Sequence, residues 1–179
     1  MMKNKLYVVL DNVRSRENVG SIFRTADAAG ISKVYLCGIT PTPLKHFVLQ
    51  NVRAIDSSLT NRFSADEKIS KTALGAEKWI PWEYHKQTWR LLEKLKKGNF
   101  YIVALEQNPK SVNIFKFKIP KNCSIVLLVG NEVKGLSPKI LKYCDSIVLI
   151  PMVGRKESLN VAVAAGIAIY QLCDFPIKP

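Results

Sequence analysis

The segment YVVLDNVRSRENVGSIFRTADAAGISKVYLC, residues 7–37, has the pattern of a strand, a helix and a second strand. Tyr7–Leu10 and Val34–Cys37 are short apolar runs, and each is followed by residues that favour turns. Between them, apolar residues recur with helical spacing over Asn18–Ala29, and Gly30 ends that helix. Two strands joined by one helix form a βαβ unit, so the segment predicts a parallel sheet.

The rest of the chain continues this alternation. Further apolar runs predict strands at Phe100–Leu105, Ser124–Val129 and Ser146–Ile150. Helical patterns cover Trp89–Lys97, Ser137–Tyr143 and Asn160–Leu172. Strands that are apolar along their whole length are typical of sheets buried on both faces. We therefore expect an α/β fold, with a mostly parallel sheet and helices on both of its faces.

The region from Thr40 to Ile80 is less regular. Residues 53–74 have moderate helical potential, and Trp79–Trp82 suits a short extended piece. With 47% hydrophobic and 23% charged residues, the chain is too apolar to be disordered. It has no internal repeat, low-complexity tract or linker, so we expect a single domain over residues 1–179.

The charge balance indicates a polyanionic partner. The chain has 27 Lys and Arg residues against 14 Asp and Glu, a formal net charge of +13. Such an excess favours nucleic acid through counterion release, and an anionic membrane surface is the second candidate. A third interpretation is that the basic surface serves only solubility and binds no partner. Charge alone does not name the partner.

The sequence predicts a cytoplasmic protein, or one of an organelle matrix if the protein is made elsewhere and imported. The N-terminal residues lack the apolar core and the small-residue cleavage site of a signal peptide. No apolar run approaches the roughly 20 residues that span a bilayer. The cysteines lack metal-ligand spacing, so we expect neither a zinc site nor a disulfide framework; they are Cys37, Cys123, Cys144 and Cys173.

Polar residues follow the first predicted strand at the point where it ends. In a parallel sheet the carboxyl ends of the strands meet at one edge, and ligands bind there. Arg14, Arg16 and, further along the helix, Arg24 are candidates for contacts to phosphate, because guanidinium binds phosphate bidentately. A solvated basic face is the alternative interpretation of these arginines.

Later strand ends carry further candidates. Glu106 follows one strand, and the turn Gly130–Gly135 follows the next, where glycine permits a close approach of backbone to ligand. The turn is neither a dinucleotide fingerprint nor a phosphate-binding loop with its lysine. Ser158 and Asn160 suit the first turn of the last helix, where they would cap the helix or hold a ligand.

The last helix is built almost entirely of small apolar residues. Residues 161–168 are Val, Ala, Val, Ala, Ala, Gly, Ile and Ala, which leave the helix without a polar face. Such a helix must be buried on all sides. The sheet covers one side, and we expect a second subunit to cover another.

Four segments together resemble the SpoU/TrmH branch of the SPOUT RNA methyltransferases. They are NVGSIFRTADAAG at residues 18–30, KTALGAE at 71–77, VGNEVKGLS at 129–137, and IPM at 150–152 with SLNVAVAAG at 158–166. The segments occur in the family's order and cover essentially the whole chain. The resemblance is to a minimal catalytic domain, without the N-terminal substrate-binding domain of larger members.

The resemblance implies a fold and an activity that periodicity does not reveal. It implies a deep trefoil knot near the C-terminus that binds S-adenosyl-L-methionine (AdoMet), and a homodimer with the active site at the interface. The reaction would be methyl transfer to a ribose 2′-hydroxyl of RNA. No metal is required.

The resemblance also implies roles for individual residues. The catalytic positions correspond to Asn18, Arg24, Glu132, Ser158 and Asn160. The cofactor positions correspond to Leu105, Glu106, Gly130, Ile150, Met152, Ser158 and Leu159. Because arginine stays protonated, we expect Arg24 to hold the RNA phosphate and stabilise the developing alkoxide, while phosphate, water or Glu132 accepts the proton. Arg14 and Arg16 would bind RNA with it.

Alternatives remain open at this point. Minimal members of the family most often act on tRNA, so we favour tRNA over rRNA as the substrate. A non-catalytic RNA-binding module of the same fold is a rival, although the catalytic positions are all occupied. An enzyme that methylates a base nitrogen is another, but it would lack the Ser-Leu-Asn sequence at residues 158–160. Membrane association would explain the charge and none of the motifs.

Overall fold

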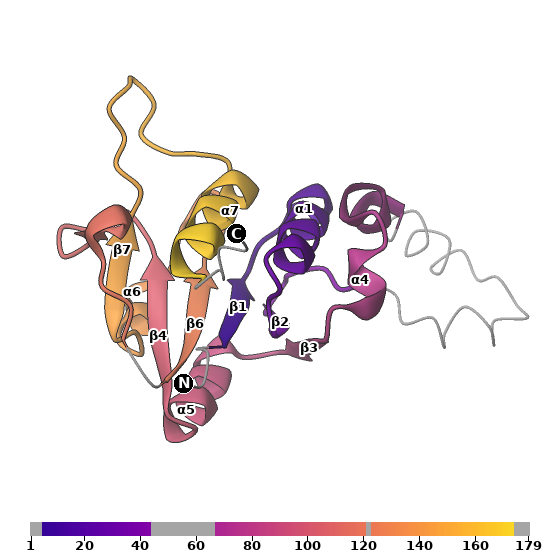
Figure 1. Ribbon diagram of the computed structural model, residues 1–179, viewed down its shortest axis with the longest axis horizontal. Coiled ribbons are helices and arrows are strands. Elements are labelled where there is room, and N and C mark those ends of the chain that lie inside the picture. The colour runs from indigo at the N-terminus through magenta and orange to yellow at the C-terminus, as the bar shows by residue number, and fades with distance from the viewer. Residues whose placement is uncertain (1–4, 44–66, 121–122, 174–179) are drawn as a thin grey trace, which may run out of the picture.

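The computed structural model describes residues 5–43, 67–120 and 123–173. Within these ranges the chain forms a seven-stranded sheet in the order β3-β2-β1-β6-β4-β7-β5, and all neighbouring strands are parallel (Figure 1). The strands are β1 (Leu6–Asp11), β2 (Lys33–Cys37), β3 (Trp82–His85), β4 (Phe100–Leu105), β5 (Val112–Asn113), β6 (Ser124–Val129) and β7 (Ser146–Leu149). The helices are α1 (Arg16–Ala28), α4 (Ala76–Trp79), α5 (Thr88–Lys97), α6 (Pro138–Leu141) and α7 (Val161–Leu172), with a 3-10 turn, η1, at Ile114–Lys116.

The sheet is buried on both faces, as the sequence predicts. Along β1, Leu6, Val8 and Leu10 belong to one apolar cluster, which includes residues of α1 and α7. Val9, between them, belongs to a second cluster with residues of α5 and α6. Alternate residues of a strand point to opposite faces, so these clusters are the two layers of the core. Helices therefore cover both faces of the sheet.

The predicted helix boundaries are correct to within a few residues. The first helix begins at Arg16 instead of Asn18, because Ser15 caps it by accepting a hydrogen bond from the backbone nitrogen of Asn18 at 3.2 Å. The last helix starts as expected, with Asn160 as its N-cap. Ser137 likewise caps α6, which ends at Leu141 instead of Tyr143.

The region between β2 and α5 departs from the prediction. Part of it, residues 44–66, lies outside the described residues, and so does most of the segment with moderate helical potential. Residues 67–73 are helical. The predicted extended piece at Trp79–Trp82 is wrong for Trp79, which ends α4, and a strand begins only at Trp82.

The first and last helices lie side by side on one face of the sheet (Figure 1). Gly166 of α7 faces Thr25 of α1, and a Cβ on Gly166 would make an ordinary van der Waals contact with Cγ2 of Thr25 at 3.7 Å. On another side of α1, a Cβ on Gly20 would lie 2.3 Å from the carbonyl oxygen of Ile69. Gly20 thus lets the helical segment 67–73 pack directly against α1.

The carboxyl ends of all the strands lie along one edge of the sheet, since every strand pair is parallel. Beyond that edge a loop, residues 150–160, leads from β7 back across the sheet to α7 (Figure 1). None of the helices in the described ranges has the length and apolar character that crossing a bilayer requires.

Candidate functional site

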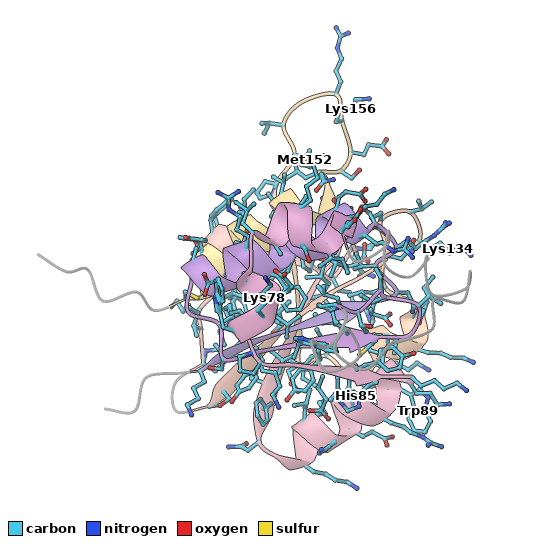
Figure 2. The ribbon with its side chains drawn as sticks, turned by 90° about the vertical axis from the view of Figure 1, so that its right-hand side faces the viewer. Lys78, His85, Trp89, Lys134, Met152 and Lys156 are labelled. Atoms are coloured by element: carbon cyan, nitrogen blue, oxygen red, sulfur yellow. The ribbon has the colours of Figure 1, made fainter. Side chains whose placement is uncertain are left out.

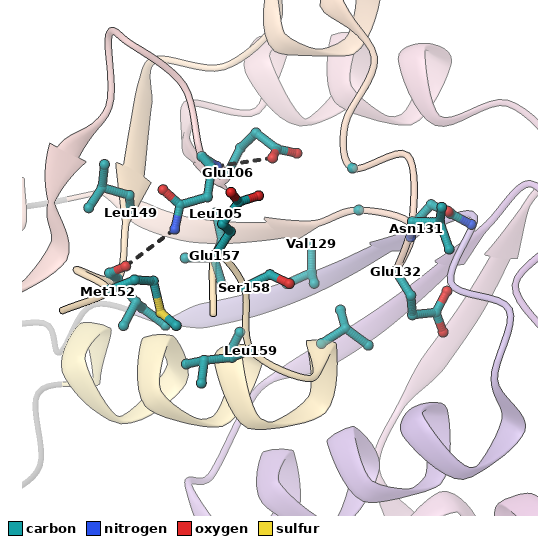
Figure 3. Close-up of a pocket in the computed structure, with 17 residues that line it drawn as sticks. Leu105, Glu106, Val129, Asn131, Glu132, Leu149, Met152, Glu157, Ser158 and Leu159 are labelled. Carbon is teal, nitrogen blue, oxygen red and sulfur yellow. Dashed lines mark hydrogen bonds between the residues drawn. The ribbon is translucent and has the colours of Figure 1, made fainter. Parts of the chain in front are cut away.

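A pocket of about 350 Å³ lies at the carboxyl edge of the sheet, beside the N-terminal end of α7 (Figure 3). The last residues of three strands line it: Leu105 of β4, Val129 of β6 and Leu149 of β7. Val161, the first residue of α7, lines it as well. The volume falls within the range of about 300–1,000 Å³ that is usual for small-molecule sites.

Every residue that the sequence assigns to cofactor binding lines this pocket: Leu105, Glu106, Gly130, Ile150, Met152, Ser158 and Leu159. Of the residues assigned to catalysis, Glu132 and Ser158 also line it, whereas Asn18, Arg24 and Asn160 do not. The parallel sheet is what brings these segments together, because it places the exits of β4, β6 and β7 next to one another.

The turn from Gly130 to Gly135 forms one wall of the pocket and leaves no room for a side chain. A Cβ on Gly130 would lie 2.7 Å from the carbonyl carbon of Gly135 and 2.8 Å from the side chain of Leu136. Gly135 has a φ of +61°, a left-handed conformation that glycine adopts without strain. The two glycines therefore let the turn close tightly on itself, with Gly130 packed against Gly135 and Leu136.

Hydrogen bonds join this wall to the neighbouring strand exits. The backbone nitrogen of Leu136 donates to Oε2 of Glu106 at 2.6 Å, and that of Gln107 donates to Oε1 at 3.0 Å. Nε2 of Gln107 donates to the carbonyl oxygen of Ile150 at 3.4 Å (Figure 3). The Glu106 carboxylate thus fixes the pocket wall through the protein's own backbone.

Sequence reasoning missed several residues of this wall. Gln107 and Glu157 line the pocket and were given no role. Asn131 organises the turn: its Oδ1 accepts from the backbone nitrogens of Val133 and Lys134, and its Nδ2 donates to the carbonyl oxygen of Asn12 at 2.8 Å. The signal for Asn131 was present, because asparagine between a glycine and a turn favours such side-chain-to-backbone bonds.

Glu132 joins the same turn to the start of α1. Its carboxylate accepts hydrogen bonds from the backbone nitrogens of Arg14, at 3.0 Å, and Ser15, at 2.9 Å, and from Nδ2 of Asn18, at 3.1 Å. Burial raises the pKa of Glu132, but these hydrogen bonds outweigh it, and the net pKa is lowered. The carboxylate is stabilised in its ionised form and is correspondingly a weak base.

Asn18 lies between Glu132 and Asn160. Nδ2 of Asn160 donates to Oδ1 of Asn18 at 3.1 Å, and Nδ2 of Asn18 donates to Glu132. Oδ1 of Asn160 also caps α7, accepting from the backbone nitrogens of Ala162 and Val163. Three segments far apart in the sequence are therefore linked by one chain of side-chain hydrogen bonds beside the pocket.

The predicted RNA-binding arginines are not gathered in one cluster around the pocket. Arg14 lies in the loop before α1, and Arg16 and Arg24 are on α1; all three are exposed. In the part of the chain that the structure describes, the guanidinium groups of Arg16 and Arg24 form no ion pair. Arg24 is thus an exposed residue of α1 that does not belong to the residues enclosing the pocket.

The sequence matches the SpoU rRNA methylase family over residues 5–58 and 45–170, which together cover most of the chain. The chain belongs to the SpoU family. Its fold, its strand-edge pocket and its Gly130–Gly135 turn are thus those of a SpoU protein.

Individual SpoU relatives cover the described fold almost completely. A tRNA (guanosine(18)-2′-O)-methyltransferase of Aquifex aeolicus is 32% identical over 93% of this chain and 67% of its own length. A protein of the same name from Borreliella burgdorferi is 28% identical over 94% of this chain and 66% of its own. An AdoMet-bound rRNA methyltransferase from Sinorhizobium meliloti is similar in structure, with a TM-score of 0.75 and 28% identity, over 96% of this chain and 56% of that one.

The chain covers only part of the length of these SpoU relatives. The covered share is 56% for the structure from Sinorhizobium meliloti and 67% for the Aquifex aeolicus protein. The matched residues include all those that line the pocket.

Proposed function

We propose that this protein transfers a methyl group from AdoMet to a ribose 2′-hydroxyl of RNA, with tRNA as the substrate. The observation that carries the proposal is the pocket enclosed by Leu105, Gly130, Ile150, Met152 and Leu159, beside the Asn160–Asn18–Glu132 hydrogen bonds. Relatives named as tRNA 2′-O-methyltransferases support the reaction and the substrate class. The net charge of +13 supports a nucleic-acid partner.

The pocket suits AdoMet in size and in chemistry. The peptide groups around Gly130 would supply hydrogen bonds to AdoMet, and Leu105, Ile150 and Leu159 would supply apolar contact. Met152 and Ser158 complete the enclosure. When bound, AdoMet would supply a methyl group on a sulfonium, whose sulfur leaves as a neutral thioether, so the protein has to position the hydroxyl and move its proton.

Glu132 acts as a positioning residue in this proposal. Its carboxylate is held ionised by the backbone of Arg14 and Ser15, and its lowered pKa makes it a poor acceptor for a hydroxyl proton. The proton then leaves to the RNA phosphate or to water. Asn18, Asn160 and Ser158 orient the ribose, and orientation alone supplies a large part of the rate of such a transfer.

Arg24 binds the phosphate next to the target ribose and stabilises the developing negative charge on the 2′-oxygen. Its guanidinium stays protonated and forms bidentate hydrogen bonds with phosphate oxygens. Since Arg24 does not line the pocket of its own subunit, we assign this role to Arg24 of the partner subunit in a homodimer.

Surface features of α1 and α7 support the homodimer. A shallow cavity along these helices is lined by small and apolar residues, including Thr25, Ala162, Val163 and Gly166. Val163 and Tyr170 are 52% and 50% exposed in the single chain, although they belong to an otherwise apolar helix. A partner packed there would bury this face and bring a second α1 towards the pocket.

We also propose that the chain is threaded as a deep trefoil knot around the pocket and that residues 1–179 form one catalytic domain. The loop at residues 150–160, which passes from β7 back over the sheet to α7, supports the knot. As a site of action we propose the cytoplasm, where the RNA substrate is made and processed.

The test is transfer of labelled methyl from AdoMet to RNA from a strain lacking the gene, separated into tRNA and rRNA and digested to nucleosides. A labelled 2′-O-methylnucleoside in tRNA is the expected result. Label confined to rRNA would keep the reaction and change the substrate, an outcome that the rRNA methyltransferase similar in structure makes the second candidate. Labelled base in place of labelled ribose would overturn the assigned reaction. Absence of label with intact AdoMet binding would contradict the substrate class, and absence of AdoMet binding would favour an RNA-binding module.

A further inference from the structure

A second cavity lies on the other side of the Gly130–Gly135 turn. It has a volume of about 790 Å³ and shares Asn131, Val133 and Gly135 with the cofactor pocket, so the turn is a common wall. We call this second cavity the side groove. Its lining residues used below are Arg14, Ile39, Lys86, Trp89, Val133 and Lys134.

The charge of the side groove is positive at its surface. Arg14, Lys86 and Lys134 are exposed, and none of them forms an ion pair within residues 5–43, 67–120 and 123–173. The one carboxylate in the described lining, Asp11, is only 4% exposed and accepts hydrogen bonds from Oγ1 of Thr88 and Nδ2 of Asn12. A ligand in the groove therefore meets the three cations and not the buried acid.

The side groove also exposes apolar and aromatic surface. Trp89 is 38% exposed, and Ile39 and Val133 are 65% and 85% exposed. Trp89 and Lys134 lie on the same side of the molecule (Figure 2). The guanidinium of Arg90 lies over the Trp89 ring, 5.2 Å from its centroid. An exposed indole can stack the face of its ring against a planar group.

A basic groove with an exposed aromatic ring is the arrangement by which proteins bind single-stranded nucleic acid. In such sites the cations bind successive phosphates of the strand. The aromatic ring stacks on a base, whichever of the four bases it is. A metabolite would not need three separated cations, and a protein strand would find no unpaired strand edge in this lining. The occupant that matches the groove is a strand of RNA.

We propose that the side groove binds the RNA strand that flanks the target nucleotide, with one base stacked on Trp89 and phosphates held by Arg14, Lys86 and Lys134. This inference rests on the proposed function, since it takes the target ribose to lie beside the cofactor pocket. Arg14 connects the two sites: its side chain lines the groove and its backbone nitrogen binds Glu132. RNA that leaves the active site past the Asn131–Gly135 wall enters the groove directly.

The test compares Trp89→Ala with Trp79→Ala, which removes an exposed tryptophan from α4, outside the groove lining. Binding of a fluorescent single-stranded RNA is measured by anisotropy, methyl transfer gives KM and kcat for tRNA, and calorimetry gives the Kd for AdoMet. Loss of one stacked base weakens binding by about tenfold or more. For Trp89→Ala we expect this loss of RNA affinity, a raised KM for tRNA and an unchanged Kd for AdoMet. Trp89→Phe should be close to wild type in all three quantities, and Trp79→Ala should equal wild type.

The phosphate contacts can be tested separately, by the salt dependence of RNA binding. Each contact to a single strand contributes about 0.7 to the slope of log affinity against log salt concentration. Lys134→Gln and Lys86→Gln should each lower that slope by this amount. Lys97→Gln, at the opposite end of α5 from Trp89, is the matched control and should leave the slope unchanged.

The outcomes separate this inference from the proposed function. Normal methyl transfer with unchanged KM and RNA affinity in Trp89→Ala would overturn the side groove and leave the activity standing. Groove-dependent RNA binding without any methyl transfer by the wild type would support the groove and overturn the activity. Absence of RNA binding by the wild-type protein would overturn both.

Discussion

The side-chain amides of Asn160 and Asn18 are hydrogen bonded at 3.1 Å, although 142 residues separate them in the sequence. Through Asn18 the N-terminal end of α7 is connected to Glu132 and thus to the turn that walls the pocket. The three side chains that we propose for the active site, Asn160, Asn18 and Glu132, are therefore held to one another by hydrogen bonds.

Asn160 caps α7 and donates a hydrogen bond to Asn18, and one substitution can remove the second contact while it keeps the first. Asn160→Asp keeps an oxygen to cap α7 but removes the amide that donates to Asn18. We expect the thermal midpoint to be preserved and kcat to fall by about 100-fold, the effect of a small misplacement of reacting groups. Asn160→Ala should lose the same activity and, in addition, about 1 kcal/mol of stability from the missing cap. Full activity of Asn160→Asp would show that the link to Asn18 does not position the ribose.

The lowered pKa of Glu132 makes its contribution to stability depend on pH. Because the folded-state pKa lies below the ordinary 4.5, the ionised carboxylate stabilises the fold above that value, and the contribution is lost as pH falls through the folded-state pKa. We expect Glu132→Gln to be less stable than wild type at about pH 7, and the difference to narrow as the pH falls towards about 3 in urea unfolding.

Glu157→Gln is the control for this comparison, since Glu157 is exposed in the loop at residues 150–160. It should match the wild type at both pH values. A constant difference between Glu132→Gln and wild type across the range would refute the link to ionisation.

Gly130 has no space for a methyl group, whereas Gly154 has open space. A Cβ on Gly130 would contact the backbone of Gly135 and Leu136 within 2.8 Å, and nothing lies within 4 Å of one on Gly154. We expect Gly130→Ala to lower stability by about 1–3 kcal/mol through overpacking and to weaken AdoMet binding in calorimetry. Gly154→Ala should change neither, and an equally unaffected Gly130→Ala would mean that the turn does not contact the cofactor.

Mixing two inactive variants tests which subunit provides Arg24. If the arginine acts across the dimer, a heterodimer of Arg24→Ala and Asn160→Ala has one intact site. Equal amounts should then recover roughly a quarter of wild-type activity, since half the dimers are mixed and each has one working site. Each variant alone should retain AdoMet binding and transfer almost no methyl. No recovery on mixing, with dimers confirmed by light scattering, would place Arg24 in the site of its own subunit.

The central strands could be predicted from sequence, and the edge strands could not. β1, β2, β4, β6 and β7 contain continuous apolar runs, because packing on both faces requires them. β3 and β5 are at the two ends of the sheet order, and their residues are partly or largely exposed. The sequences WEYH and VN carry little apolar signal, so neither was expected as a strand.

The candidate site followed from sequence only with the help of the family resemblance. The strand-end rule places Glu106, Gly130 and Ser158 near one edge, and all three line the pocket. Spacing does not indicate that Asn160 meets Asn18, because nothing in a linear pattern reports a contact over that separation. The side groove was not foreseen either, since Lys86, Trp89 and Lys134 form no motif and meet only in the folded chain.

The packing of α7 against α1 affects how this protein folds during its synthesis. Contacts between the two ends of a chain form late in folding, because closing a long loop costs entropy before any contact repays it. On the ribosome, α1 is synthesised first, and its contacts with α7 form only after residue 172 has left the exit tunnel. A nascent chain therefore lacks the Asn160–Asn18 hydrogen bond until the last helix has been synthesised.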